Sequence, residues 1–251
     1  MQENQEETLP AAVAEHRFMR PLRSFVRRGG RLTAAQERAM VDLAPEYLID
    51  VPRDSGVTSI AVGSATDPQK WYPQSAPLTV EIGSGQGHQI THGAKQHPER
   101  NFLAVEVFVG GLARTMVLAA QQDVHNLRMI EANAPEVLEH LLPEASVAEV
   151  WIFFPDPWHK ARHNKRRLIS PSFMPVLARA LQPGAVVRLA TDWAEYAEQM
   201  REVFDAAPQF SRDFEGEWAP RFEGRVLTAF EQKGINAGRE IFDLTYRKAA
   251  A

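Results

Sequence analysis

The sequence predicts an α/β fold in which helices cover both faces of a mainly parallel sheet. Two observations predict it. From residue 78 onward, short apolar runs of strand length alternate with segments of helical periodicity. Several of the apolar runs end in glycine or in polar residues, as strands do when they lead to a ligand site at the edge of a parallel sheet.

The predicted strands are short and apolar, as expected where a parallel sheet is buried on both faces. They are Leu78–Ile82, Phe102–Val107, Leu127–Ile130, Val147–Phe154, Ala185–Ala190 and, closing the sheet as an antiparallel strand near the C-terminus, Ile241–Tyr246.

The predicted helices lie between these strands. They are Ile90–Gln96, Gly110–Gln121, Pro135–Leu142, Pro171–Leu181 with Gly184 marking the turn out of it, and Trp193–Ala206. An earlier helix is expected from Thr33, its N-cap, to about Ala44.

Three regions follow from this pattern. Residues 1–16 are acidic and lack an apolar run, so we expect a disordered tail and no signal peptide. Residues 17–77 form a basic extension and a linker rich in proline, glycine and serine. Residues 78–251 form the α/β domain. Since no stretch approaches the roughly 20 apolar residues of a membrane span, we expect a cytoplasmic protein without a membrane partner, either a monomer or a homodimer.

Composition excludes several chemistries. The 251 residues contain no cysteine, which removes thiol nucleophiles, cysteine zinc sites and cysteine-held iron–sulfur clusters, and we expect no metal. The net charge is −4, yet the basic residues are concentrated in two clusters. Such clusters on an acidic protein indicate a local contact with a polyanion. They comprise Arg17, Arg20, Arg23, Arg27, Arg28 and Arg31, and Lys160, Arg162, Lys165, Arg166 and Arg167 with His159 and His163 among them.

The first predicted strand ends in a glycine-rich turn, Gly83-Ser84-Gly85-Gln86-Gly87, with Glu81 just before it. A dinucleotide fingerprint would place its third glycine one residue later. Glu81 suits the cationic amino group of a methionine moiety, although a plain turn with a surface glutamate fits the glycines equally well. Glu106, at the end of the second strand, lies close to the spacing at which an acidic residue holds ribose hydroxyls. Asn133, after the third strand, suits an adenine edge or, as plausibly, caps a turn.

The fourth strand runs into Phe153-Phe154-Pro155-Asp156-Pro157-Trp158-His159-Lys160 and then the second basic cluster. Two prolines hold a rigid loop around Asp156. A carboxylate, an aromatic ring and a basic run in one loop suit a nucleobase with phosphates alongside. Core packing of Trp158 and a solvated basic loop are the weaker alternatives.

These motifs together resemble the bacterial tRNA (guanine-N7-)-methyltransferases, which have a Rossmann-like class I methyltransferase fold. The resemblance covers nearly the whole chain after residue 15. It includes Arg23-Ser24-Phe25-Val26-Arg27-Arg28, the glycine-rich turn, the Phe153–Arg167 string, Ala190-Thr191-Asp192-Trp193 and Thr228-Ala229-Phe230-Glu231.

The resemblance implies a reaction and roles for residues. The reaction is methyl transfer from S-adenosylmethionine to N7 of a tRNA guanine, position 46 in the variable loop. Cofactor contacts are implied for Glu81, Gly83, Gly85, Gly87, Glu106, Asn133 and Asp156, and Asp156 is also the implied catalytic residue. Substrate contacts are implied for Lys160, Asp192, Thr228, Ala229, Phe230 and Glu231. RNA contacts are implied for Arg162, His163, Asn164, Lys165, Arg166 and Arg167, together with Arg27 and Arg28.

Two positions depart from the family pattern. Asn133 stands where many members have aspartate, and Ala229 where lysine is common. Three other functions stay open. A methyltransferase acting on an exocyclic base amine places Asp/Asn-Pro-Pro-aromatic after the same strand, which is close to the order found here. The glycine spacing disfavours a nucleotide-dependent oxidoreductase, and the set of acidic residues disfavours a non-catalytic RNA-binding protein.

Overall fold

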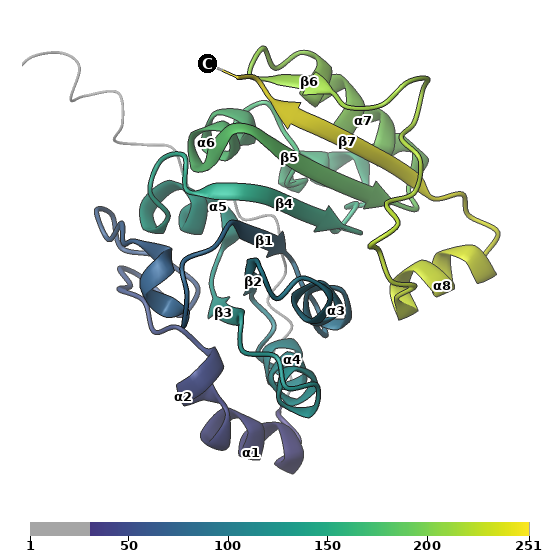
Figure 1. The fold of residues 1–251 in the computed structure, drawn as a ribbon. Helices are drawn as coiled ribbons and strands as arrows, with labels where there is room; N and C mark the ends of the chain where they lie inside the picture. The colour runs from purple at the N-terminus through teal and green to yellow at the C-terminus, as the bar shows by residue number, and fades with distance from the viewer. Residues whose placement is uncertain (1–30, 251) are drawn as a thin grey trace, which may run out of the picture.

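The computed structural model describes residues 31–250, and its central feature is a seven-stranded sheet (Figure 1). The strand order is β3-β2-β1-β4-β5-β7-β6. Neighbours from β3 to β5 pair in parallel, while β7 is antiparallel to both β5 and β6. The strands are β1 Leu78–Ile82, β2 Asn101–Glu106, β3 Leu127–Glu131, β4 Val147–Phe153, β5 Leu181–Thr191, β6 Phe210–Arg212 and β7 Phe242–Lys248. The predicted fold class and the antiparallel C-terminal strand are confirmed.

Alternation along the strands divides the core between the two faces of the sheet. Leu103 of β2 and Val150 of β4 belong to one buried cluster, whereas their neighbours Phe102 and Trp151 belong to the other. The second cluster receives side chains from α1 Ala34–Asp42, α2 Ala44–Tyr47, α3 His88–Gln96 and α4 Val109–Gln121. The first receives them from α5 Ala134–Glu136, the π-helical turn η4 Val137–Leu141, α6 Phe173–Ala180 and α7 Ala194–Asp205. Helices therefore cover both faces, as predicted.

Three features at the C-terminal half differ from the predictions. β5 begins at Leu181, four residues before the expected Ala185, so Gly184 lies within the strand instead of marking a turn before it. Leu181 pairs with Val147, and regular pairing resumes only between Val186 and Glu149. The irregular stretch between these pairs accommodates Gly184, whose φ is 76°. The short edge strand β6 and helix α8 Ala229–Asn236 were not predicted.

The predicted helix near the N-terminus forms as expected. Thr33 caps α1, and its side chain accepts a hydrogen bond from the backbone of Gln36 in a capping box. Residues 49–77 of the linker are irregular except for the 3₁₀ turn η3 Pro68–Trp71. The predictions for the 1–16 tail, for Arg27 and for Arg28 lie outside the described residues.

The order of the strands fixes where a ligand can bind. β1 lies between β2 and β4, so the connections leave it in opposite directions and open a crevice beyond its carboxyl end. Glu81, Glu106 and the loop after Phe153 all come at this edge. Within residues 31–250, no helix is long and apolar enough to cross a membrane.

Candidate active site

A cleft of about 700 Å³ opens at the carboxyl ends of β1, β2 and β4. Its wall brings together most of the residues that the sequence singled out for the cofactor. The predicted residues on the wall are Glu81, Gly83, Gly85, Glu106, Asn133, Asp156, Thr228, Ala229 and Phe230. Four other predicted residues, Gly87, Lys160, Asp192 and Glu231, do not line it.

The glycine-rich turn passes beneath this cleft with three glycines in the left-handed region. The φ angles of Gly83, Gly85 and Gly87 are 74°, 57° and 76°, values that other residues rarely adopt. A Cβ at Gly83 or Gly85 would meet no atom within 4 Å, so their conformation, not space, requires glycine. Gly87 differs, because a Cβ there would lie 2.2 Å from the Thr115 side chain. Gly87 therefore permits close packing of α3 against α4.

Gly111 contributes to the same turn, and the sequence analysis missed it. A Cβ on this residue of α4 would lie 2.1 Å from the carbonyl oxygen of Gly85. Glycine at position 111 thus lets the backbone of α4 pack directly against the glycine-rich turn. A Gly-Gly pair at the start of a predicted helix was the signal, since glycine is unfavourable inside helices unless packing requires it.

Glu81 is buried at the floor of the cleft with one carboxylate oxygen, Oε2, that has no hydrogen-bond partner among the described residues. Burial and the nearby Glu106 carboxylate raise the pKa of Glu81 well above its ordinary value. A buried carboxylate held in this way favours a cationic partner, which would supply the missing hydrogen bond and stabilise the charge. The hydroxyl of Ser84, in the glycine-rich turn, is also buried and has no hydrogen-bond partner within residues 31–250. Glu81 therefore fits the ammonium group of a methionine moiety.

Glu106 is oriented by the main chain. Its carboxylate accepts hydrogen bonds from the backbone N–H groups of Gly85 at 2.7 Å, Val107 at 2.6 Å and Phe108 at 3.0 Å. Burial raises its pKa despite these hydrogen bonds. A carboxylate can accept about four hydrogen bonds, so one acceptor position is left for a ribose hydroxyl.

Asn133 lies on the wall next to Ala132 and Ala134 and is 2% exposed. Its backbone N–H donates to the carbonyl of Thr58 at 2.7 Å, and its side-chain amide donates to Glu136 at 2.9 Å. The apolar neighbours suit contact with the face of an adenine ring. The Asn133 amide lies in the same wall and suits contact with the edge of that ring. The residues present therefore fit the amino group, the ribose and the adenine of S-adenosylmethionine.

The 154–160 loop leaves β4 with two residues in a strained conformation. Phe154 and Trp158 have φ values of 53° and 49°, which are uncommon for bulky residues and are concentrated at functional sites. The backbone N–H of Phe154 donates to the carbonyl of Ala190 at 2.8 Å, so the neighbouring strand holds the first turn. Asp156 lies between Phe154 and Trp158, and it is exposed to the cleft. The sequence predicted the rigid loop but not the positive φ values.

The basic segment after this loop divides into an exposed part and one buried arginine. Lys160, Arg162, Lys165 and Arg166 are exposed on and before η5 Ala161–Arg166, and His163 and Asn164 are half-buried. The Arg166 guanidinium lies 5.0 Å from the centre of the Trp158 ring.

Arg167, in contrast, is 1% exposed. It donates to the carbonyl of Pro157 at 2.8 Å, to Gln199 at 2.7 Å and to Glu195 at 3.1 Å, and it lies over the ring of Tyr196. The prediction that Arg167 contacts RNA therefore does not agree with its position, because all three of its nitrogen atoms bind protein. Arg167 joins the 154–160 loop to α7.

Apart from Lys160, which precedes η5, the predicted substrate residues lie in or near α8. Thr228 caps the helix by accepting a hydrogen bond from the backbone of Glu231 at 3.3 Å. Phe230 is 60% exposed and reaches the cleft. Asp192 lies beyond the other end of the helix, where Arg239 donates to it at 2.8 Å and Gly234 packs against it.

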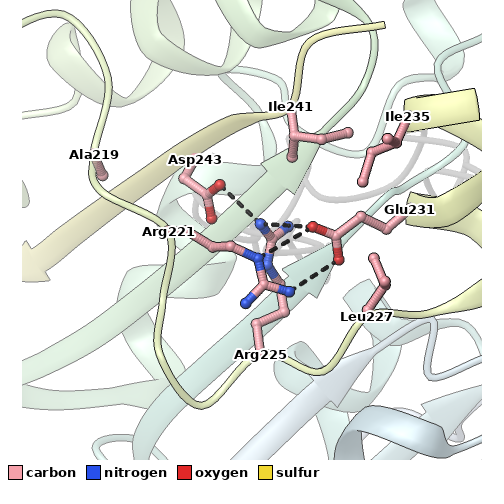
Figure 2. A pocket seen from close by; sticks show the side chains of 8 residues that line it. All are labelled: Ala219, Arg221, Arg225, Leu227, Glu231, Ile235, Ile241 and Asp243. Atoms are coloured by element: carbon pink, nitrogen blue, oxygen red, sulfur yellow. Dashed lines mark hydrogen bonds and ion pairs between the residues drawn. The ribbon is translucent and has the colours of Figure 1, made fainter. Parts of the chain in front are cut away.

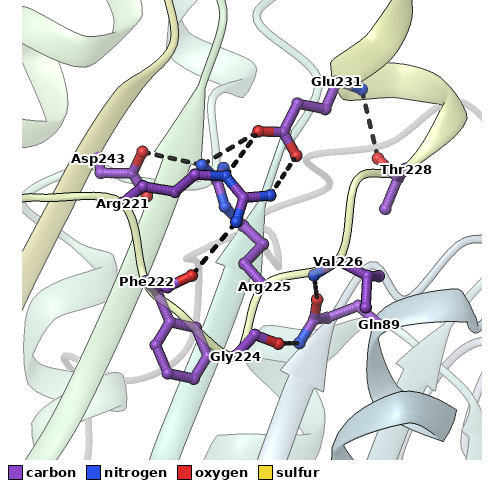
Figure 3. Close-up of polar contacts among 9 residues, drawn as sticks. All are labelled: Gln89, Arg221, Phe222, Gly224, Arg225, Val226, Thr228, Glu231 and Asp243. Carbon is purple, nitrogen blue, oxygen red and sulfur yellow. Dashed lines mark hydrogen bonds and ion pairs between the residues drawn. The ribbon is translucent and has the colours of Figure 1, made fainter.

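Glu231 points away from the cleft into a cluster of charged side chains, which line a second hollow of about 590 Å³ (Figure 2). Arg221 donates to both of its carboxylate oxygens, and Arg225 forms an ion pair with it at 3.2 Å (Figure 3). Arg225 also binds Asp243 of β7 at 2.9 Å. Burial raises the pKa of Asp243 to about 6 even with Arg225 beside it.

Comparison with known proteins agrees with this geometry. Residues 75–244 match a family model described as a putative methyltransferase. The tRNA (guanine-N(7)-)-methyltransferase of Paenarthrobacter aurescens is 43% identical over 90% of this chain and 91% of its own length. The enzyme of the same name from Cutibacterium acnes is 44% identical over 92% of this chain and 85% of its own.

The chain belongs to the tRNA (guanine-N(7)-)-methyltransferase family.

A solved structure supports the fold of this family member. The 16S rRNA methyltransferase KamB superposes with a TM-score of 0.50 over 72% of this chain and 90% of its own, at 16% identity. At that identity the likeness shows the fold alone, a class I methyltransferase sheet. Asn133 and Ala229, where the sequence analysis expects a departure from the family pattern, both line the cleft.

Proposed function

We infer that this chain transfers a methyl group from S-adenosylmethionine to N7 of a guanine in tRNA, at position 46 of the variable loop. The observation that carries the proposal is one cleft that gathers Glu81, Glu106 and Asn133 with Asp156, in a chain about 40% identical to enzymes of that name. Bound S-adenosylmethionine supplies an activated methyl group on a sulfonium. A tRNA substrate also supports action in the cytoplasm.

The chemistry of the target explains the residue types. Guanine carries N7 and O6 as acceptors on one edge, and N7 must stay free to accept the methyl group. The protein must therefore bind guanine by its opposite edge, where N1–H and the N2 amino group are donors. A carboxylate accepts both of these hydrogen bonds, and they strengthen as the ring gains positive charge.

The described structure favours Asp156 as that carboxylate. Its side chain is exposed to the cleft, while Asp192 and Glu231 are held by Arg239 and by Arg221 and Arg225. Since N7 carries no proton, the reaction needs no general base. We propose that Asp156 orients the base and stabilises its developing charge.

A tRNA transcript offers a direct test. Incubation with S-adenosylmethionine, followed by digestion and mass spectrometry, should give N7-methylguanosine. A matched transcript with 7-deazaguanine in place of guanine carries a C–H group at that position and should not be methylated. Methylation of the 7-deaza transcript would instead favour transfer to an exocyclic amine.

A further inference from the structure

Helix α8 carries the substrate segment but is not held to the domain by apolar packing. Of its eight residues only Glu231 and Gly234 are buried. The apolar side chains of Phe230 and Ile235 are 60% and 45% exposed. In Figure 1 the helix lies apart from the layered core, beside the ends of β4 and β5. Its position therefore depends on polar contacts.

The segment before α8, residues 219–228, is tied to the domain from two sides. On the cofactor side, the Gln89 side chain donates to the carbonyl of Gly224 at 2.9 Å and accepts from the backbone N–H of Val226 at 2.8 Å (Figure 3). Between these two anchored residues stands Arg225, whose side chain is 1% exposed. The Arg225 side chain makes the contacts of this segment on the side away from Gln89.

Arg225 contacts β7, α8 and the start of the 154–160 loop at once. One nitrogen, Nη2, lies 2.9 Å from Asp243 on β7 and 3.2 Å from Glu231 on α8. The guanidinium carbon also lies 5.5 Å from the centre of the Phe154 ring, where the strained 154–160 loop begins. Because guanidinium is planar, it can pair with carboxylates at its edge while its face covers an aromatic ring.

Arg221 cannot replace this connection. It pairs with Glu231 and contacts the carbonyl of Phe222, but its side chain is 43% exposed, and within residues 31–250 it forms no hydrogen bond or ion pair with Asp243 or with the 154–160 loop. Arg225 is thus the described residue that joins α8 to both the sheet and the loop bearing Asp156.

We propose that Arg225 is a positioning residue for methyl transfer, which acts through Glu231 and Phe154 to fix the Thr228–Glu231 segment relative to Asp156. The proposal rests on the proposed function. Arg225 itself lies on the wall of the cleft, but the residues assigned to the cofactor, Glu81, Glu106 and Asn133, lie on other elements. We therefore expect the cleft to bind the cofactor without Arg225. Loss of Arg225 would instead misplace the guanine.

The test is Arg225→Lys, which keeps the positive charge but removes the planar guanidinium that lies over the Phe154 ring. Arg100→Lys is the matched control, because Arg100 pairs at 2.8 Å with the buried Glu149, which a second arginine, Arg188, also holds. Arg100 lies just before β2 and Glu149 near the start of β4, away from the carboxyl ends of the strands where the cleft lies. We expect Arg225→Lys to reduce kcat/KM for tRNA about tenfold or more, with the Kd for S-adenosylmethionine within about twofold of wild type. The control should leave both nearly unchanged.

Hydrogen–deuterium exchange gives a readout that does not need activity. In Arg225→Lys, the amides of residues 229–236 should exchange faster while those of β1 and β4 do not change. If exchange and kcat/KM both match the Arg100→Lys control, or if cofactor affinity falls as far as kcat/KM, the proposal is wrong. Wild-type protein that binds the cofactor but methylates no tRNA would refute the proposed function, whereas the exchange result would still report on Arg225.

A second variant covers the possibility that the lysine unfolds the protein. Arg225→Met combined with Asp243→Asn removes one positive and one negative charge and leaves Glu231 paired with Arg221. The same split between tRNA kinetics and cofactor affinity is expected, and wild-type kinetics in this double variant would overturn the proposal.

Discussion

Arg166 and Arg167 are neighbours of identical chemistry, yet their substitution should have opposite consequences. Arg166 is exposed, with its guanidinium over Trp158, and is free to approach a phosphate. Arg167 is buried and makes three hydrogen bonds to protein groups. The perturbation is Arg166→Gln compared with Arg167→Met.

The structure sets the size of each effect. Loss of one phosphate contact lowers the slope of log Kd against log salt by about 0.9. Hydrogen bonds to a buried charge stabilise by roughly 1.5–3 kcal/mol each, but Glu195 is 63% exposed, so its bond contributes little. Arg167→Met should therefore destabilise the fold by about 3 kcal/mol, which corresponds to a fall of roughly 6–12 °C in Tm for a chain of this length.

Two measurements check this pair. Fluorescence anisotropy of labelled tRNA over a series of salt concentrations gives the slope, and a thermal melt gives Tm. We expect Arg166→Gln to reduce the slope and keep its Tm, and Arg167→Met to lose Tm and keep the slope while folded. An Arg167→Met protein that keeps the wild-type Tm and loses the slope would show that Arg167 contacts RNA and would refute the reasoning.

Three further predictions concern the cleft. Asp156→Asn should lower single-turnover methyl transfer by about 10²–10³-fold with cofactor Kd unchanged, and near wild-type turnover would remove Asp156 from the mechanism. Because burial and Glu106 raise the pKa of Glu81, lowering the pH through that raised pKa protonates the carboxylate. Cofactor affinity should therefore fall toward acid pH, and calorimetry in buffers of different ionisation enthalpy should detect protons released on binding; a pH-independent Kd would contradict this. Gly111→Ala should weaken cofactor binding about tenfold or more, since its Cβ would lie 2.1 Å from the Gly85 carbonyl oxygen. Equilibrium binding measures this, and an unchanged Kd would show that α4 shifts without cost and would contradict the prediction.

The sequence was informative wherever local pattern decides structure. Strand β1 has the predicted bounds, α4 begins one residue before the predicted helix, and α7 is one residue shorter than predicted at each end. The parallel arrangement then brings the strand ends together, so the sequence alone predicts Glu81, Glu106 and Asp156 at one edge of the sheet. Short elements without periodicity were missed, such as the three-residue edge strand β6 and helix α8, whose side chains are mostly exposed.

Charged residues were harder to assign, because their partners are distant in the chain. Arg167 binds Glu195 and Gln199, which are 28 and 32 residues away, and Arg225 binds Asp243, 18 residues away. In the sequence, Arg167 continues a basic run and Glu231 completes a substrate motif. Whether such a side chain faces solvent, a ligand or another charge depends on contacts that no local pattern encodes.

The sequence alone determined a parallel α/β sheet, its glycine-rich turn and the acidic edge of the cofactor cleft, because hydrophobic periodicity and glycine conformation act over a few residues. Only the tertiary structure decided that Gly87 and Gly111 serve packing, that Arg167 supports a loop and that Arg225 holds α8. Each of these depends on burial and on the desolvation of charge, which arise only when distant segments come together.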